Sequence, residues 1–285
     1  MAPFTRLTCP LDQSPLRVEG PQLRCAQGHS FDIGQPGYVN LLPVQHKRSR
    51  APGDSKEMVA ARHAFLSSGL YAPVAGFVTQ ALTPVSHPQA VLLDAGCGEG
   101  YYLDQLLGAL PLAPEHCYGL DISKWAIQRA ARRRCDVNWL VSTNRQPPLA
   151  PGSADILLCM FGFQSYPGFS DVLGPGGHLV LVEAGPDHLR ELREIIYPQV
   201  KEKSLPRSDA AQAAGLRLVS SERKQYHIAL NTKHLAQLLV MTPHLYRATA
   251  EGKAAAAALD HLDVTLDICI QILEKPTGQA GSSFC

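Results

Sequence analysis

The chain has 285 residues and a mass of 30.9 kDa, a length that corresponds to about two domains. Hydrophobic residues make up 45% of it and charged residues 18%, which excludes extensive disorder and collagen-like or coiled-coil structure, and its net charge of +1 neither favours nor excludes a nucleic-acid partner. The longest apolar runs, such as Ile156 to Phe163, are far shorter than the ~20 residues of a membrane span. No basic and then apolar leader opens the chain, so we expect a cytoplasmic protein without membrane contact.

A small N-terminal module and a larger domain are expected. Residues 1–43 are rich in turns and carry Cys, His, Gly and Pro, which indicates a compact β module, and residues 44–56 form a basic linker. We expect the larger domain to span residues 57–275 and a flexible tail to span residues 276–285. The eight cysteines show no even disulfide framework, so we expect free thiols or metal ligands.

Two helical stretches, at residues 56–68 and 71–82, precede a regular alternation of strands and helices. This alternation predicts an α/β fold with a parallel sheet flanked by helices. The predicted helices are Tyr101–Ala109 and Ser123–Arg134, and the predicted strands are Val91–Asp94, Cys117–Asp121, Asn138–Val141, Asp155–Met160, His178–Glu183, Leu216–Glu222, Tyr226–Leu230 and Val264–Leu273.

The strongest motif is the glycine-rich loop at residues 94–100, Asp-Ala-Gly-Cys-Gly-Glu-Gly, between a predicted strand and a predicted helix. A dinucleotide fingerprint would place its third glycine at position 101, where this chain has Tyr101. The next strand ends in Asp121, and an acidic side chain there can accept both hydroxyls of a ribose. The pattern predicts a nucleoside ligand without a pyrophosphate; the alternative is a tight turn in an unrelated α/β protein.

This pattern resembles the class I S-adenosylmethionine-dependent methyltransferases over about residues 85–230. The resemblance implies a Rossmann-like, mostly parallel seven-stranded sheet, with the loop under the methionine part of the cofactor and Asp121 on its ribose. The polar residues after the third strand occupy the position that often contacts adenine in that family. The cofactor-binding residues implied so far are Asp94, Gly96, Gly98, Asp121 and Asn144.

Residues of the N-terminal module have a metal-ligand character. Cys25 and His29 are separated by three residues, and Cys9 lies just before a proline. A structural zinc normally takes four ligands and begins with Cys-x2-Cys, but the second cysteine position is Asp12 here. Zinc can therefore be held only if the Asp12 carboxylate serves as a ligand; the alternative is a module that folds without metal.

A second resemblance covers nearly the whole chain, up to about residue 275. The module, and especially the segment from Gly37 to Asp54, resembles the bacterial 23S ribosomal RNA guanine-N1 methyltransferase family RlmA. The resemblance implies that residues 1–43 form a zinc-ribbon-like module that recognises RNA. In that family the module binds zinc through three cysteines and a histidine, which correspond here to Cys9, Asp12, Cys25 and His29. The family also implies that the cofactor is contacted by Tyr71, Glu99, Gly100 and His188. Two of these residues have an alternative interpretation: Tyr71 can be an ordinary packing residue, and His188 can be a surface residue of a helix.

Basic residues mark two candidate RNA-binding segments. Within the linker, His46, Lys47, Arg48 and Arg50 can contact phosphates, and Tyr38 offers a stacking face, although a solvated hinge is the alternative. A second cluster extends over residues 124–134 and is either a polyanion-binding face or a solvated surface.

Methylation of guanine N1 requires removal of its proton, and the candidate bases are Glu183 and His188. The Asn/Asp-Pro-Pro-Tyr motif of methyltransferases that modify exocyclic amines is absent at residues 159–163, which is compatible with a ring nitrogen. Phe161 or Phe163 can stack on a flipped guanine, with core packing as the alternative for each.

We therefore expect an enzyme that methylates N1 of a guanosine in a hairpin of 23S rRNA, with S-adenosyl-L-methionine as cofactor and with Zn²⁺ if Asp12 is a ligand. Two other functions stay open: a small-molecule methyltransferase, and a non-catalytic RNA-binding or assembly factor. A homodimer, which would enlarge the RNA-binding surface, is a further possibility.

Overall fold

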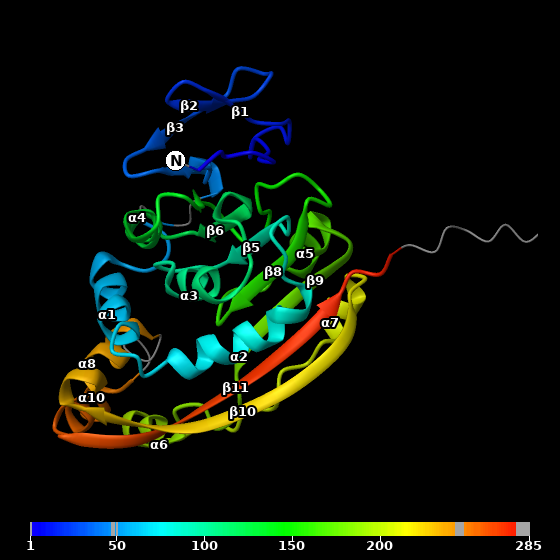
Figure 1. Cartoon of the computed structure of the whole chain (residues 1–285). Helices are drawn as coiled ribbons and strands as arrows, with labels where there is room; N and C mark the ends of the chain where they lie inside the picture. The colour runs from blue at the N-terminus through cyan, green and yellow to red at the C-terminus, as the bar shows by residue number, and fades with distance from the viewer. Residues whose placement is uncertain (1, 47–48, 50, 243–247, 278–285) are drawn as a thin grey trace, which may run out of the picture.

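The computed structural model describes residues 2–46, 49, 51–242 and 248–277, and this part forms one sheet covered by helices (Figure 1). The strands are β1 (Arg17–Glu19), β2 (Gln22–Arg24), β3 (Ser30–Gly34), β4 (Tyr38–Asn40), β5 (Leu92–Ala95), β6 (Cys117–Asp121), β7 (Asn138–Val141), β8 (Ala154–Met160), β9 (Leu173–Ala184), β10 (Arg217–Asn231) and β11 (His261–Glu274). The α-helices are α1 (Lys56–Leu66), α2 (Ala72–Leu82), α3 (Tyr101–Ala109), α4 (Lys124–Arg133), α5 (Tyr166–Val172), α6 (Arg190–Ile196), α7 (Asp209–Ala213), α8 (Thr232–Met241) and α10 (Ala250–Ala257), and short 3-10 helices cover Val44–His46, Thr83–Val85 and Pro114–His116.

The large domain contains a seven-stranded sheet in the order β7-β6-β5-β8-β9-β11-β10. Neighbouring strands from β7 to β9 are parallel, whereas β11 runs antiparallel to both β9 and β10. The predicted mostly parallel, helix-flanked sheet is thus confirmed. Because the strand order reverses direction beside β5, ligands are expected at the carboxyl ends of the strands near that point.

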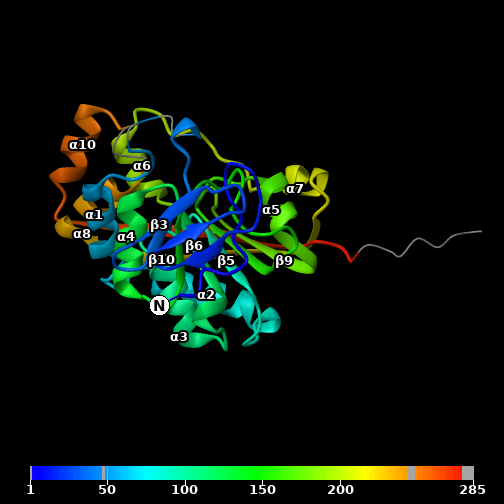
Figure 2. The same ribbon diagram turned by 90° about the horizontal axis from the view of Figure 1, so that it is seen from above.

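Two hydrophobic cores lie on opposite faces of the sheet. Helices α2, α3 and α4 cover one face with side chains such as Val78, Leu103 and Ile127. On the other face, α5 and α7 pack together with the N-terminal module, which contributes Phe4 and Leu7. Helices α1, α8 and α10 gather at one end of the molecule in both views (Figures 1 and 2).

The N-terminal module is continuous with the large domain. Strand β4 pairs in parallel with β7, so that β1 to β4 extend the sheet to eleven strands. The Phe4 amide donates to Asn138 Oδ1 at 2.7 Å, and the Leu41 amide donates to the carbonyl of Val141 at 2.9 Å. Figures 1 and 2 both show the module directly over the central strands. The module therefore folds against the large domain over a shared core.

Three local predictions are corrected. The two strands expected over residues 216–230 form one strand, β10, because it is the outermost strand and keeps its intervening polar side chains in water. The helix expected to open at Asp187 and His188 begins at Arg190, because Leu189 has a φ of 53° and interrupts it. Finally, the strand predicted over His178–Glu183 is longer, because β9 begins at Leu173 and includes the glycine-rich residues 174–177.

Within the described ranges, no helix combines the length and the apolar character needed to cross a bilayer. None of the cysteines of the same part, from Cys9 to Cys269, forms a disulfide, in agreement with the expectation of free thiols or metal ligands.

Candidate functional site

The glycine-rich loop lies at the carboxyl end of β5 and is fixed by the end of β6. The amides of Gly96 and Cys97 donate to the carbonyl of Leu120 at 2.7 and 3.0 Å. The Gly98 amide donates to Asp121 Oδ2 at 3.0 Å. Gly96 and Gly98 have φ values of 89° and 55°, in the left-handed region that favours glycine. The sequence thus builds a backbone cradle beside an acidic side chain.

Asp121 is preoriented to accept further hydrogen bonds. Its Oδ1 accepts the amide of Ser123 at 2.7 Å, while Oδ2 accepts that of Gly98. A carboxylate has about four lone-pair positions, so each oxygen keeps one for a ligand hydroxyl. Burial is the main cause that raises the pKa of Asp121. The side chain therefore fits the two hydroxyls of a ribose.

Asp94 brings a second carboxyl group to the same cradle. Its side chain is 2% exposed. Burial, and secondarily the charge of Asp121, raises its pKa to about 8. Ionisation of a buried carboxyl group is costly, so this group fits a ligand that supplies a donor or a positive charge.

This pKa predicts a distinct pH dependence of stability. An unfolded Asp ionises near pH 4, whereas Asp94 ionises near 8 in the native state, so the native state holds an extra proton between these values. Stability contributed by this group therefore falls as pH rises through that window, by up to about 1.4 kcal/mol per pH unit. In the cofactor-free protein, the melting temperature of Asp94→Asn minus that of the wild type should therefore increase as pH rises from about 5 to about 8. Thermal melts with Asp136→Asn as control test this; a difference independent of pH would contradict it.

Gly100 and Glu99 connect the loop to helices α3 and α4. An added Cβ at Gly100 would lie 2.8 Å from the buried ring of Trp139, and its φ is 79°, so glycine is required. The Glu99 side chain is 1% exposed and its Oε2 accepts from Arg133 at 2.7 Å and lies 3.1 Å from His63 Nδ1. The other oxygen, Oε1, is buried without a hydrogen-bond partner among the described residues, so one acceptor stays available to a ligand.

Asn144 joins the glycine-rich loop to the segment after β8. It is buried, and its Nδ2 donates to the carbonyl of Phe163 at 2.8 Å. A Cβ added at Gly96 would contact both this amide group and Gly162. Phe161 and Phe163 are 43% and 60% exposed, so the core-packing alternative is excluded for both. Phe161 also adopts a φ of 51°, a strained conformation for an aromatic residue that is typical of functional segments.

His188, Glu183 and Tyr71 occupy different positions around this edge. The His188 ring lies 5.9 Å from that of Phe161 at an angle of 33°, and its Nδ1 is 3.0 Å from the carbonyl oxygen of Asp267. Because a carbonyl only accepts, Nδ1 carries the proton. Glu183 is half-buried on β9 and pairs with Cys269 of β11. Tyr71 precedes α2, is buried against Phe65, and burial raises its pKa.

An ionic network around one buried carboxylate, that of Asp267, fixes the turn that carries His188. Asp267 is fully buried and receives two hydrogen bonds from Arg223, each of 2.8 Å, and one from the Asp187 amide at 2.9 Å. Burial opposes ionisation of Asp267, but these donors outweigh it and hold its pKa below the usual range. A Cβ at Gly185 would lie 2.3 Å from this carboxylate. Arg223 and Asp267 are therefore positioning residues, which sequence reasoning missed.

We expect Arg223→Gln to disturb the turn that carries His188. The change leaves the buried Asp267 carboxylate without its arginine partner, so the variant should melt at a lower temperature than the wild type. Below the melting temperature of the variant, the KM for the cofactor should rise severalfold while the KM for the nucleic-acid or small-molecule acceptor changes little. Arg217→Gln, at an exposed pair of the same sheet edge with Glu274, is the control; equal cofactor KM values in both variants would contradict the role.

The structure brings the expected metal ligands together. His29 Nδ1 lies 3.0 Å from Asp12 Oδ2, 3.5 Å from Cys9 Sγ and 3.4 Å from Cys25 Sγ, and all four ligand atoms lie within 4.8 Å of one another. Zinc in a tetrahedral site, with bonds of ~2.0–2.3 Å, separates its ligand atoms by about 3.3–3.8 Å. Ser14 donates two hydrogen bonds to Asp12 Oδ1, which lowers the pKa of this carboxyl group and leaves Oδ2 facing the other ligands. The donor set fits zinc.

Two of the expected RNA-binding residues, Tyr38 and His46, lie within the described residues. Lys47, Arg48 and Arg50 lie outside the described residues, and His46 ends a short 3-10 helix. The expected stacking role of Tyr38 is corrected: its ring is 7% exposed and its hydroxyl accepts from Gln128, because β4 is an inner strand of the sheet. In the cluster at residues 124–134, three arginines form ion pairs with acidic residues: Arg129 and Arg133 with Glu99, and Arg134 with Asp136.

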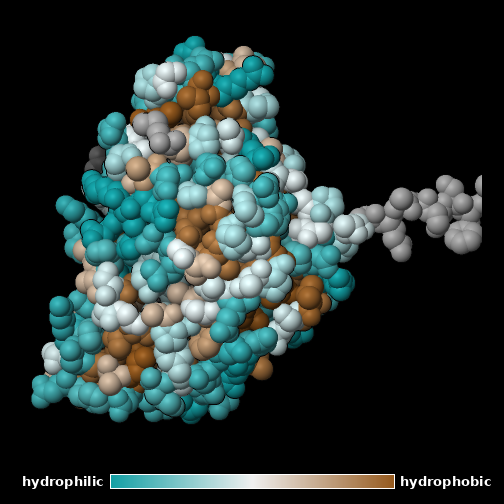
Figure 3. Space-filling model, in the orientation of Figure 1, coloured by the Kyte–Doolittle hydropathy of each residue, from teal (hydrophilic) through white to brown (hydrophobic). Residues whose placement is uncertain are grey.

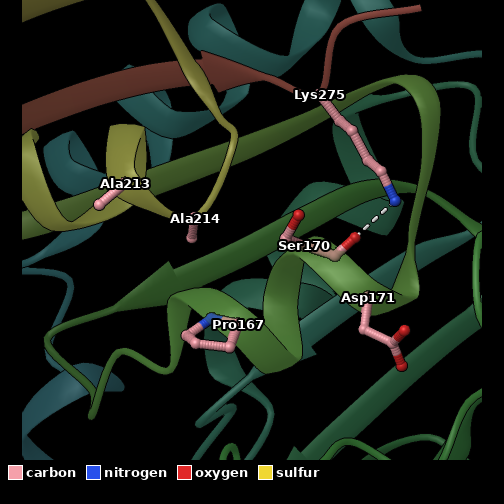
Figure 4. A pocket seen from close by; sticks show the side chains of 6 residues that line it. All are labelled: Pro167, Ser170, Asp171, Ala213, Ala214 and Lys275. Carbon is pink, nitrogen blue, oxygen red and sulfur yellow. Dashed lines mark hydrogen bonds between the residues drawn. The ribbon is translucent and has the colours of Figure 1, made fainter. Parts of the chain in front are cut away.

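An open hollow of about 530 Å³ lies away from this edge, at the end of α5 (Figure 4). Lys275 reaches into it and donates to the carbonyls of Ser170 and Leu173 at 2.6 and 2.7 Å. These contacts satisfy the carboxyl end of α5, which gives Lys275 a structural role. The hollow is lined by Pro167, Ser170, Asp171, Ala213, Ala214 and Lys275.

The sheet order, the antiparallel β11 and the glycine-rich loop between two acidic residues define a class I methyltransferase. A family model described as "Methyltransferase domain" matches residues 92–177, and one described as "RlmA, N-terminal" matches residues 7–50. The methyltransferase in a solved complex with the Haloferax volcanii Trm112 activator has the same fold, with a TM-score of 0.50 and 18% identity over 79% of this chain and 99% of that one.

Two relatives resemble the chain over most of its length. It is 34% identical over 271 residues to a Micromonospora griseorubida protein provisionally named 23S rRNA (guanine-N1)-methyltransferase, covering 87% of this chain and 86% of that protein. It is also 34% identical over 245 residues to the 23S rRNA (guanine(748)-N1)-methyltransferase of Streptomyces fradiae, covering 83% and 84%. The chain belongs to the family of 23S rRNA (guanine-N1)-methyltransferases.

Proposed function

We propose that this protein transfers the methyl group of S-adenosylmethionine to N1 of a guanosine in a hairpin of 23S rRNA. The observation that carries the proposal is the extent of the similarity: its identity to guanine-N1 relatives spans both the N-terminal module and the methyltransferase domain. A small-molecule methyltransferase would have no evident use for the module.

The carboxyl edge of the sheet supplies the cofactor site. We propose that Asp121 accepts the ribose hydroxyls, that Asn144 lies beside the adenine, and that the loop from Asp94 to Gly100 supports the methionine part. Tyr71 and His188 border the same edge as further proposed contacts. When bound, the cofactor supplies an activated methyl group on a sulfonium, and the chain contributes position and electrostatics.

The acceptor guanine is proposed to stack on Phe161, the exposed and strained aromatic residue at the end of β8. In the transfer, the N1–carbon bond forms as the carbon–sulfur bond breaks, and the N1 proton must pass to a base. His188 and Glu183 are the two candidates, and His188 is the one in contact with Phe161. The sequence Cys159 to Phe163 lacks the amine-methylation motif, in agreement with a ring nitrogen as acceptor.

The N-terminal module is proposed to bind zinc through Cys9, Asp12, Cys25 and His29 and to contact the RNA. Four of the six separations between its ligand atoms are 3.0 to 3.5 Å and all six lie within 4.8 Å, which supports a metal site here. The basic residues that follow the module, His46, Lys47, Arg48 and Arg50, are proposed phosphate contacts. Phosphate contacts make affinity fall steeply with salt, so RNA binding should weaken strongly between about 50 and 200 mM salt.

The substrate class can be tested by incubating the protein with labelled S-adenosylmethionine and, separately, unmodified 23S rRNA, 16S rRNA or free guanosine. The proposal predicts label in 23S rRNA alone. Transfer to free guanosine but not to RNA would favour a small-molecule enzyme. RNA binding without any transfer would favour an assembly factor. Either result would overturn the proposal.

A further inference from the structure

We infer that two exposed pairs of a cation and an aromatic ring, Lys56 with Trp125 and Arg145 with Phe163, are platforms on which unpaired bases of the RNA substrate stack. The inference rests on the proposed function, and it specifies how the RNA is held around its target nucleotide. We name these pairs the Trp125 platform and the Phe163 platform.

The Trp125 platform joins the start of α1 to the start of α4. The Trp125 ring is 43% exposed, and Lys56 Nζ lies 6.0 Å from its centre. The two helices are held together here because Ser123 Oγ donates to the carbonyl of Asp54 at 2.7 Å. Ser123 also accepts from the Ala126 amide and donates its own amide to Asp121, so the platform begins four residues from the proposed ribose ligand.

The Phe163 platform is built from the loops after β7 and β8. Phe163 is 60% exposed, and Arg145 Cζ lies 5.5 Å from its ring centre. The backbone on both sides is fixed: the Phe163 carbonyl accepts from Asn144, and Ser165 Oγ donates to the carbonyl of Arg145 at 3.2 Å. Phe161, on which we place the target guanine, is two residues away. The Phe163 ring is therefore exposed to solvent on a fixed backbone, beside the proposed guanine site.

The two platforms flank the cofactor edge. Helix α4 packs on the first core, through Ile127, whereas the segment that follows Phe163 packs on the second core, through Phe169. The platforms thus lie on opposite faces of the sheet at the same carboxyl edge. A strand of RNA that places one base at Phe161 can extend past both.

Cations that have no carboxylate partner favour RNA as the molecule that binds at these platforms. Within the described ranges, Lys56, Lys124 and Arg145 form no ion pair with a carboxylate, in contrast to Arg129, Arg133 and Arg134 of the same region. Figure 3 shows hydrophilic side chains gathered over α4 and the neighbouring end of α1. An exposed ring beside an unpaired cation suits a nucleotide, because the base stacks on the ring while the cation meets the phosphate.

Alanine and ring-retaining variants test this inference. Trp125→Ala and Phe163→Ala should each raise the Kd and the KM for 23S rRNA about 5- to 150-fold, the range that loss of one stacked base produces. Trp125→Phe and Phe163→Tyr should keep most of the affinity, and the Kd for S-adenosylmethionine should not change in any variant. Val219→Ala, an exposed apolar position on β10, is the matched control.

The outcomes separate this inference from the proposed function. Alanine variants that bind and methylate 23S rRNA as the wild type does would overturn the platforms and leave the proposed function standing. Equal losses in the alanine and ring-retaining variants would also overturn them, because the aromatic face would then not be what binds. A wild-type protein that methylates no RNA would overturn the proposed function itself.

Discussion

Replacing Cys25 with serine is expected to lower the melting temperature of the whole chain. Cys25 is both a proposed metal ligand and part of the core that the module shares with the large domain. Loss of a structural zinc ligand should cost at least about 3 kcal/mol, although less than the ~10–16 kcal/mol by which zinc stabilises isolated finger peptides, because the domain core remains. For a chain of this size that corresponds to a decrease of roughly 6 °C or more.

Because the module and the large domain share a hydrophobic core, we expect the destabilisation by Cys25→Ser to extend beyond the module. Leu23 and Val39 of the module are fully buried in the same cluster as Tyr118 and Leu140 of the large domain. Calorimetry of the metal-loaded protein should therefore show one transition that moves as a unit. Cys135→Ser, at an exposed cysteine, should leave it in place. Zinc content near zero in protein purified without chelator, together with a normal melt for Cys25→Ser, would contradict the metal centre.

Replacing Asp121 with alanine is expected to weaken the binding of S-adenosylmethionine by about 1–3 kcal/mol, or roughly 5- to 150-fold. The variant loses the acceptor for two ligand hydroxyls and also the two hydrogen bonds that fix Gly98 and Ser123. Asp121→Asn keeps one acceptor and should lose less. Isothermal titration calorimetry gives the affinities directly.

Asp136→Ala provides the matched control for this experiment. Its carboxylate is paired with Arg134 and lies outside the glycine-rich loop, so the affinity for the cofactor should not change. Wild-type affinity in Asp121→Ala would remove Asp121 from the site, and equal losses in both variants would indicate a general effect of charge.

Local patterns predicted the strands, the loop and the metal cluster because their determinants are close in sequence. The loop from Asp94 to Gly100 is a contiguous motif between a strand and a helix, and Asp121 ends the next strand. The ligands from Cys9 to His29 lie within one short module. In such cases the residue type and the spacing already contain most of the geometry.

The features that the sequence did not predict depend on contacts between residues that are far apart in the chain. Tyr38 resembled an exposed aromatic residue in a polar segment, but the parallel pairing of β4 with β7 buries it. Arg223 and Asp267 come from β10 and β11, far along the chain from His188, and nothing in their local sequence indicates a contact. The same holds for Lys56 and Trp125, which are brought together by the bond between Ser123 and Asp54.

The central claim, methyl transfer to guanine N1 in 23S rRNA, is tested most directly by the identity of the modified nucleoside. Unmodified 23S rRNA is reacted with labelled S-adenosylmethionine and the protein, digested to nucleosides, and analysed by mass spectrometry. We predict 1-methylguanosine, confined to one hairpin and absent when Asp121→Ala replaces the wild type at low cofactor concentration. A methyl group on the exocyclic amine or on another base, or no modified nucleoside from protein that binds the cofactor, would contradict this account.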